Sequence, residues 1–347
     1  MATKPAQARI LLRTLLISLI ATCAAAPALA HVRWFVEAGV AVEGFEPYSL
    51  TSPEVLIWIA LATGIVGASV WLDTVLPDVR IVDSKTRHDF IEILRIFTGM
   101  SCLLTAYDGA IVAPHLDASG GFGTLLLWVQ SIIGILLIAN RFIRHVAIWM
   151  LLLHLGLAIK FGVIAALEYL IMPGIAVFLL INNLPTDALR VRWKPYSVSL
   201  LRIFTGISLI TLGFSEKLLN AQMAETFLIV NNWNFLALIG LDWFSDRLFV
   251  LSAGVVEVVF GVILVLGTTT RLNVLAFSAT LLASNVIFLV EGNREAALLE
   301  FIGHIPIMGV ALILLLLGYG QTLRITNLLP HARVNTRTRT IRVPEEA

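Results

Sequence analysis

Ionisable side chains inside long apolar segments are the residues of this sequence best placed to do chemistry. Glu257 lies near the middle of an apolar run, 247–267, and is flanked by valines. A charge at the centre of a membrane-spanning helix costs about 2.5–3.5 kcal/mol on insertion scales, so it needs a partner or a function. We therefore expect Glu257 either to be protonated and hydrogen-bonded across the protein, or to handle protons.

A second polar group gathers at the predicted outer ends of neighbouring apolar segments. Four residues separate Glu300 from His304, which places both on one helix face. Such a pair can bind a metal, orient an imidazole or relay a proton, although an ordinary intrahelical hydrogen bond would also explain it. In a compact bundle these groups would reach Glu257. The predicted catalytic residues are Glu257, Glu300 and His304, and the predicted ligand-binding residues are Asn285, Lys217 and Glu216.

A third candidate site depends on how the N-terminus is processed. Basic residues precede a short apolar stretch that ends in Ala28-Leu29-Ala30, which is typical of a cleaved signal peptide. Cleavage would leave His31 at the N-terminus, where its amino group and ring nitrogen could chelate copper together with His115. The alternative is that His31 occupies this position by coincidence and binds no metal. An uncleaved signal anchor is a further alternative.

The composition predicts an integral membrane protein. The chain has 347 residues, of which 58% are hydrophobic and 14% charged, whereas about a quarter are charged in soluble domains. Apolar runs long enough to cross a bilayer recur along it. After signal cleavage about nine spans are expected, at 54–74, 91–108, 123–140, 145–166, 167–183, 197–218, 247–267, 272–291 and 298–319.

Charge distribution predicts the orientation of these spans. With a periplasmic N-terminus, fourteen Lys and Arg side chains fall in predicted cytoplasmic segments and five in external ones. This indicates a bacterial inner membrane protein with a cytoplasmic C-terminus, in contact with the lipid bilayer. Only Cys102 remains after cleavage, so redox chemistry would need a cofactor or a partner protein.

The sequence also contains an internal repeat. "LRIFTGMS" at 94–101 returns as "LRIFTGIS" at 201–208, and two further matches follow in the same order, at 130–144 with 257–271 and at 167–175 with 299–307. Each copy holds four predicted helices, so the fold class is all-α, with one transmembrane helix and two tandem parallel four-helix units. The predicted domains are a signal peptide 1–30, an external segment with one helix and a linker 31–90, a degenerate unit 91–196, a second unit 197–324, and a basic cytoplasmic tail 325–347.

The motifs of the second unit resemble those of the DoxX family of four-helix bacterial membrane proteins. The resemblance is carried by "LRIFTG", "FSEK", "VEVVFGVILVLGTTTR" and the closing "LLLLGYGQTLR". The first unit departs from this pattern, because "AYDG" stands for "FSEK" and Gln130 replaces Glu257. The resemblance implies a membrane subunit of a quinone oxidoreductase or a partner of a redox system. We accordingly expect the second unit to hold the site and the first to be scaffold.

Three functions remain open at this point. The first is a membrane subunit of a quinone-linked electron-transfer system, with a redox or periplasmic protein partner. The second is a non-enzymatic module that binds copper or scaffolds a partner, and the third is a small-solute permease. The sequence carries no P-loop, dinucleotide fingerprint, HExxH or CxxCH motif, and nothing beyond the arginines of the tail favours nucleic acid.

Overall fold

The part of the chain that the structure describes is built from helices, apart from one short strand pair. The computed structural model describes residues 32–36, 46–80, 84–231, 233–238, 240–318, 321–328 and 339–340. The α-helices are α2 (Pro53–Val75), α3 (Ser84–Tyr107), α4 (Gly120–Ile138), α5 (Ile143–Phe161), α6 (Val163–Glu168), α7 (Ile171–Asn182), α8 (Asp187–Leu212), α9 (Ala221–Asn231), α10 (Phe235–Leu238), α11 (Asp246–Leu266), α12 (Thr270–Val290) and α13 (Arg294–Leu317).

Shorter elements complete the described chain. Residues Val32–Trp34 and Ile325–Leu328 form the 3₁₀ helices η1 and η3, and Gly213–Leu218 forms a π-helix, η2, that continues α8. Strand β1 (Val79–Arg80) pairs in parallel with β2 (Arg339–Thr340). We call residues 32–36 the strap, the end of the bundle where they lie the strap end, and the opposite end, where residues 321–328 lie, the tail end.

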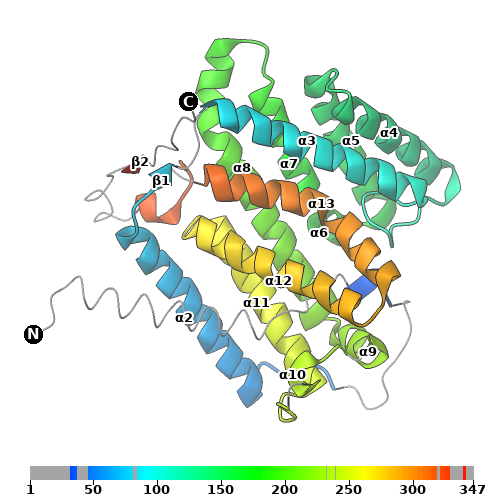
Figure 1. Ribbon diagram of the computed structural model, residues 1–347, viewed down its shortest axis with the longest axis vertical. Helices are drawn as coiled ribbons and strands as arrows, with labels where there is room; N and C mark the ends of the chain where they lie inside the picture. The colour runs from blue at the N-terminus through cyan, green and yellow to red at the C-terminus, as the bar shows by residue number, and fades with distance from the viewer. Residues whose placement is uncertain are drawn as a thin grey trace, which may run out of the picture.

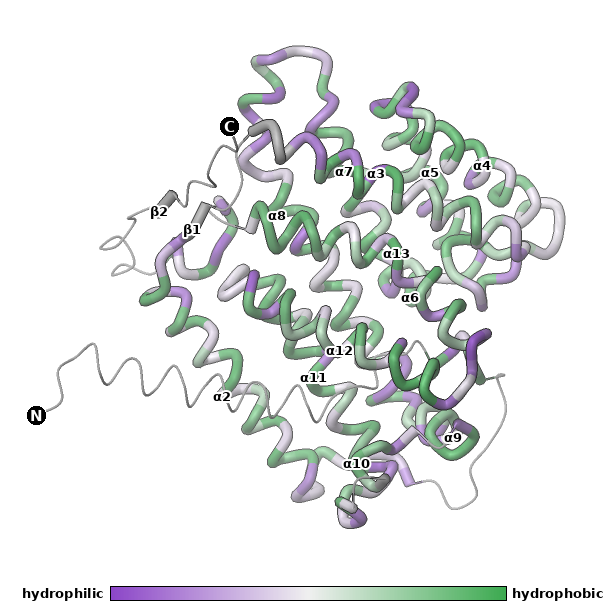
Figure 2. The backbone as a smooth tube through the Cα atoms, viewed as in Figure 1, coloured by the Kyte–Doolittle hydropathy of each residue, from purple (hydrophilic) through white to green (hydrophobic). Residues whose placement is uncertain are grey.

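The long helices identify an all-α membrane protein. Within the described residues, eight helices are long and apolar enough to cross a bilayer, if η2 is counted with α8. Figure 2 shows them as mostly hydrophobic along their length, with hydrophilic residues towards the helix ends and connections. Large apolar side chains such as Leu125, Trp128 and Ile135 of α4 are exposed, which suits contact with lipid.

One of the nine expected spans, 167–183, is not a helix long enough to cross a bilayer. Sequence patterning predicts spans at 145–166 and 167–183, but α5 ends at Phe161 because Gly162 has a φ of +91°, which is incompatible with helix. The chain then forms the short α6 and, after a turn, α7. The twelve residues of α7 reach about 18 Å, which is less than a bilayer core requires.

The two sets of helices repeat the same neighbour relations. In the first set α3 packs on α4 and α5 on α7, and in the second set α8 packs on α11 and α12 on α13. The last helix of each set packs on the first helix of the other, α7 on α8 and α13 on α3 (Figure 1). The two sets are therefore joined along two matching seams.

Two pairs of glycines mark corresponding helix contacts in the two sets. A Cβ atom at Gly99 or at Gly134 would lie 2.9 Å from the carbonyl oxygen of the other residue. At Gly206 and Gly261 the corresponding distances are 2.6 Å and 2.5 Å. The first helix of each set thus touches the second backbone to backbone, and the residues involved are those that the repeated phrases align.

The repeated arginines also make equivalent hydrogen bonds in the two sets of helices. Arg95 Nη1 donates to the carbonyl of Ile138 at 3.1 Å, and Arg202 Nη1 donates to Val265 at 2.9 Å and also to Leu264. Both arginines therefore cap the last turn of a neighbouring helix, α4 for Arg95 and α11 for Arg202, where carbonyls lack partners and the helix dipole is negative. Arg202 is fully buried and donates in addition to Gln321 and Leu323, which ties the C-terminal segment to the bundle.

We expect Arg202→Met to lower the free energy of unfolding by about 2–3 kcal/mol, because several buried carbonyls lose their donor. Arg95→Met should cost about 1 kcal/mol, since Arg95 keeps fewer carbonyls paired and lies beside the partly exposed Glu92. Unfolding of purified protein in mixed micelles would measure both. Equal losses for the two variants would contradict the stronger capping role of Arg202.

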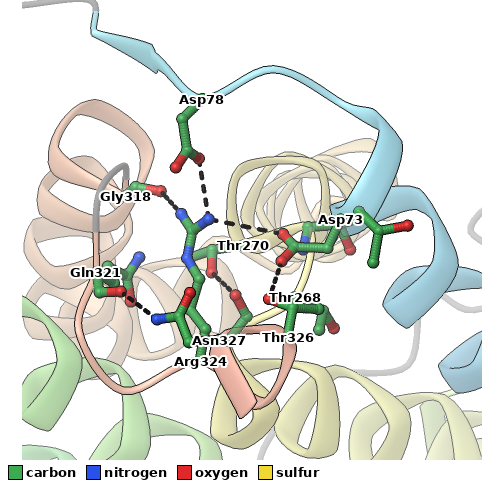
Figure 3. A network of polar contacts seen from close by, with 12 residues as sticks. Asp73, Asp78, Thr268, Thr270, Gly318, Gln321, Arg324, Thr326 and Asn327 are labelled. Carbon is green, nitrogen blue, oxygen red and sulfur yellow. Dashed lines mark hydrogen bonds and ion pairs between the residues drawn. The ribbon is translucent and has the colours of Figure 1, made fainter. Parts of the chain in front are cut away.

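The lone helix α2 lies beside α11 and is anchored by polar contacts at the tail end (Figure 1). Asp73 accepts hydrogen bonds from the Thr269 amide at 3.0 Å and from the Thr326 hydroxyl at 2.7 Å. Arg324 pairs with Asp78 at 2.9 Å and lies 3.9 Å from Asp73. Figure 3 shows this network joining α2, the start of α12 and the C-terminal segment.

Candidate functional site

A buried ion pair forms the centre of the candidate site. Lys217 Nζ lies 2.8 Å from Glu257 Oε2, and each side chain is only 3% exposed. Lys217 belongs to η2, where the wider π-helical turn interrupts the regular spacing of α8. Close backbone contact between Gly213 and Gly254 brings η2 against α11, so the lysine reaches the carboxylate. Glu257 therefore has a cationic partner, which offsets the free-energy cost of burying its carboxylate.

A second acidic group lies on the last helix of the same set. Glu300 Oε1 lies 3.6 Å from His304 Nδ1 and accepts a hydrogen bond from Ser284 at 3.2 Å. Both Glu300 and His304 are buried. Lys217 interacts electrostatically with Glu300 and Glu216 as well as with Glu257, so these groups form one neighbourhood.

The strap brings residues of the first set into this neighbourhood. The main-chain amide of Val32 donates to Glu216 at 3.2 Å, and Arg33 forms an ion pair with the fully buried Glu168 at 2.8 Å. Trp34 Nε1 donates to the Tyr169 hydroxyl at 3.4 Å, and Tyr169 interacts electrostatically with Glu216.

Taken together, these contacts define what we call the strap-end cluster. Its members are buried and come from η2, α11 and α13 of the second set and from the junction between α6 and α7 of the first. The strap-end cluster comprises Glu168, Tyr169, Glu216, Lys217, Glu257, Glu300 and His304.

The structure brings together five of the six residues predicted for the pocket. Glu216, Lys217, Glu257, Glu300 and His304 all belong to the strap-end cluster. Asn285 does not join them, because its side-chain amide donates to Leu281 of its own helix at 3.2 Å. Its neighbour Ser284 faces Glu300 instead, since adjacent residues on a helix point in different directions.

Sequence reasoning missed the part of the site that the first set and the strap provide. The sequence predicts that the first unit is scaffold, yet Glu168 and Tyr169 lie in the cluster and contact Arg33 and Trp34 of the strap. One signal for Glu168 was present, because the repeat aligns it with Glu300. No signal in the sequence indicated that the strap would reach both sets.

Gln130 shows why the two sets differ at the position of Glu257. Its buried amide nitrogen donates to Thr105 at 2.9 Å and to the carbonyls of Cys102 and Ala110, and its oxygen accepts from the Val112 amide at 2.9 Å. Gln130 therefore holds the loop after α3. In the second set the same position carries a charge paired with lysine.

The structure leaves the predicted copper site untested. His31 lies outside the described residues. His115 is half-buried in the loop between α3 and α4, with its ring centroid 5.9 Å from that of Tyr169. Among the residues that the structure describes, no group of three or more His, Cys, Asp or Glu side chains is arranged to hold a metal ion.

A pocket adjoins the strap-end cluster at the seam between the sets. It is small, with about 30 Å³ of free space, is partly open to the surroundings, and runs between α7, α8 and α13. Its walls are mostly apolar, as at Met172, Leu209 and Ile307, while Glu168 and Tyr169 form a polar part. We call it the seam pocket.

No protein-family model, curated protein or solved structure shows a significant match to this chain. The fold and the site define the class of the protein. It is a helical, multi-pass membrane protein with a buried cluster of acidic and basic side chains at one end of the bundle. The resemblance to the DoxX family stays a prediction from motifs.

Proposed function

We propose that this chain is the membrane subunit of a quinone-linked electron-transfer system. In this proposal the strap-end cluster exchanges protons with a quinone whose ring binds beside it. The observation that carries the proposal is the ion pair of Lys217 with Glu257, which is almost fully buried in an apolar bundle and adjoins Glu216 and Glu300. Ionisable groups at membrane depth are costly and mark proton or ion pathways.

The residues around the seam pocket suit a quinone. Its walls are apolar, as a lipophilic ring and tail require, but its free space of about 30 Å³ has to widen before a ring fits. The hydroxyl of Tyr169, which lines the pocket, and the imidazole of the adjacent His304 would then donate hydrogen bonds to the carbonyl oxygens of the quinone. A quinone gains two electrons and two protons when it becomes a quinol, and a redox protein partner would supply or remove the electrons. The chain itself would supply groups that hold and release the protons.

Two proton acceptors lie close to those donors. His304 neighbours Glu300, and Tyr169 neighbours Glu216, which is in turn close to Lys217 and Glu257. Each donor therefore has a carboxylate beside it. In the proposed orientation the strap end faces the periplasm of a bacterial inner membrane, and the two sets of four helices are copies of one DoxX-like unit.

Glu257→Gln tests whether Glu257 transfers protons, because the amide keeps the shape of the side chain but does not take up or release a proton. We expect membranes containing this variant to lose quinone-linked oxygen uptake by about 100-fold. His304→Ala should lower the amount of quinone that is extracted with the protein after purification in mild detergent. Glu92→Gln is the matched control, because Glu92 is a partly exposed carboxylate paired with Arg95 at the tail end.

The proposal fails if wild-type protein carries no quinone and if none of these variants changes quinone-linked oxygen uptake. A loss in Glu257→Gln that Glu92→Gln shares would also count against it, because the effect would then not depend on the cluster.

A further inference from the structure

The strap places an aromatic ring where the seam pocket meets the cluster. The indole of Trp34 lies with its centroid 5.4 Å from the His304 ring, and its nitrogen donates to the Tyr169 hydroxyl. A Cβ atom at Gly303 would overlap the indole, so the absence of a side chain there makes room for the ring. Gly303 and Tyr169 also line the seam pocket.

The neighbouring strap residues hold this ring in place. Arg33 pairs with Glu168, and the Val32 amide binds Glu216, so both flanking contacts go to buried carboxylates of the cluster. Phe35 packs on the other side against Phe227 and Phe288, with ring centroids 5.6 Å and 5.3 Å away. Residues 32–35 of the strap thus each make a different contact, and these contacts reach both sets of helices.

We propose that Gly303, His304 and Tyr169 form a binding site for a planar quinone ring, and that Trp34 occupies this site as an internal competitor. The inference rests on the proposed function, since it names where the quinone ring binds and what excludes it. A quinone and an indole are both flat and apolar in their faces. The quinone differs in offering carbonyl oxygens, which can accept hydrogen bonds from Tyr169 and His304.

Competition of this kind lowers the apparent affinity for the ligand. When only a fraction of the molecules has the site open, the apparent dissociation constant rises by the inverse of that fraction. Removing the indole opens the site in every molecule. For a strap that leaves the site in about one molecule in ten, the gain in affinity is about tenfold.

Titration of the purified full-length protein with decylubiquinone tests this inference. Trp34→Ala should bind about tenfold more tightly than wild type. Trp34→Phe, which keeps a ring, should stay near wild type, and so should Trp71→Ala, which removes an exposed tryptophan of α2. Adding Gly303→Ala to Trp34→Ala should abolish the gain, because the new methyl group enters the vacated space.

The outcomes separate this inference from the proposed function. Equal binding by wild type and Trp34→Ala would overturn the ring site and leave the quinone function standing, as would a double variant that binds as tightly as Trp34→Ala. Absence of binding in every variant would overturn both. Trp34→Leu, which retains apolar bulk without a ring, carries the same test if Trp34→Ala does not fold.

Discussion

Replacing Lys217 with methionine is expected to destabilise the protein by about 3–5 kcal/mol, the largest effect of any single change to the cluster. The substitution removes the cation from a pair that is 3% exposed on both sides and leaves the Glu257 carboxylate buried without it. Loss of one partner costs far more than the pair contributes, because the remaining carboxylate must either stay charged without a partner or take up a proton, and both are unfavourable.

The double variant Lys217→Met/Glu257→Leu separates stability from function. Well-packed apolar residues can replace a buried ion pair with little loss, so this variant should recover most of the stability lost in Lys217→Met. It should nevertheless show no quinone-linked activity, since the acid–base pair is gone. Lys160→Met is the control, because Lys160 donates to Ser119 in an exposed position. Equal losses for Lys217→Met and Lys160→Met, measured by unfolding in mixed micelles, would show that the pair is not held in the interior.

Substitution of Gly261 should have the second-largest effect, through packing. A Cβ there would lie 2.5 Å from the Gly206 carbonyl oxygen and 2.9 Å from the Ile210 amide nitrogen. Both are main-chain atoms, so a helix has to move. We expect Gly261→Ala to cost about 3 kcal/mol, at the upper end of the usual range for overpacking.

Two further glycines provide a graded comparison. Gly134→Ala should cost less than Gly261→Ala, because its closest contact is the flexible Leu103 side chain at 2.8 Å and the Gly99 oxygen lies further away at 2.9 Å. Gly64 of α2 has nothing within 4 Å, so Gly64→Ala should be neutral or slightly stabilising through helix propensity. Thermal unfolding in detergent would order the three variants. A similar loss in all three would contradict close packing of α8 on α11.

The repeated phrases mark equivalent structural positions in the two sets of helices. Aligned arginines cap equivalent helix ends, and aligned glycines meet in equivalent pairs. These features depend on residue type at a fixed place along a helix, which is why they can be read from sequence. The same holds for Glu257, whose need for a partner follows from the apolar residues around it.

The site was predicted only in part, because its composition depends on contacts between distant segments. Periodicity could not show that η2 would widen into a π-helix and turn Lys217 towards Glu257. It also could not distinguish Asn285 from Ser284, since one residue along a helix rotates the side chain by about 100°. The break at Gly162 was missed because its apolar flanks read as continuous span.

From the amino-acid sequence we predict a helical membrane protein with costly buried charges and an internal repeat. Those properties follow from hydropathy and from the spacing of residues along single helices. That the site belongs to both sets of helices and to the strap is visible only in the folded chain. Which charges become neighbours is set by the packing of segments as far apart as Arg33, Glu168 and Glu300, and no local pattern in a chain records that.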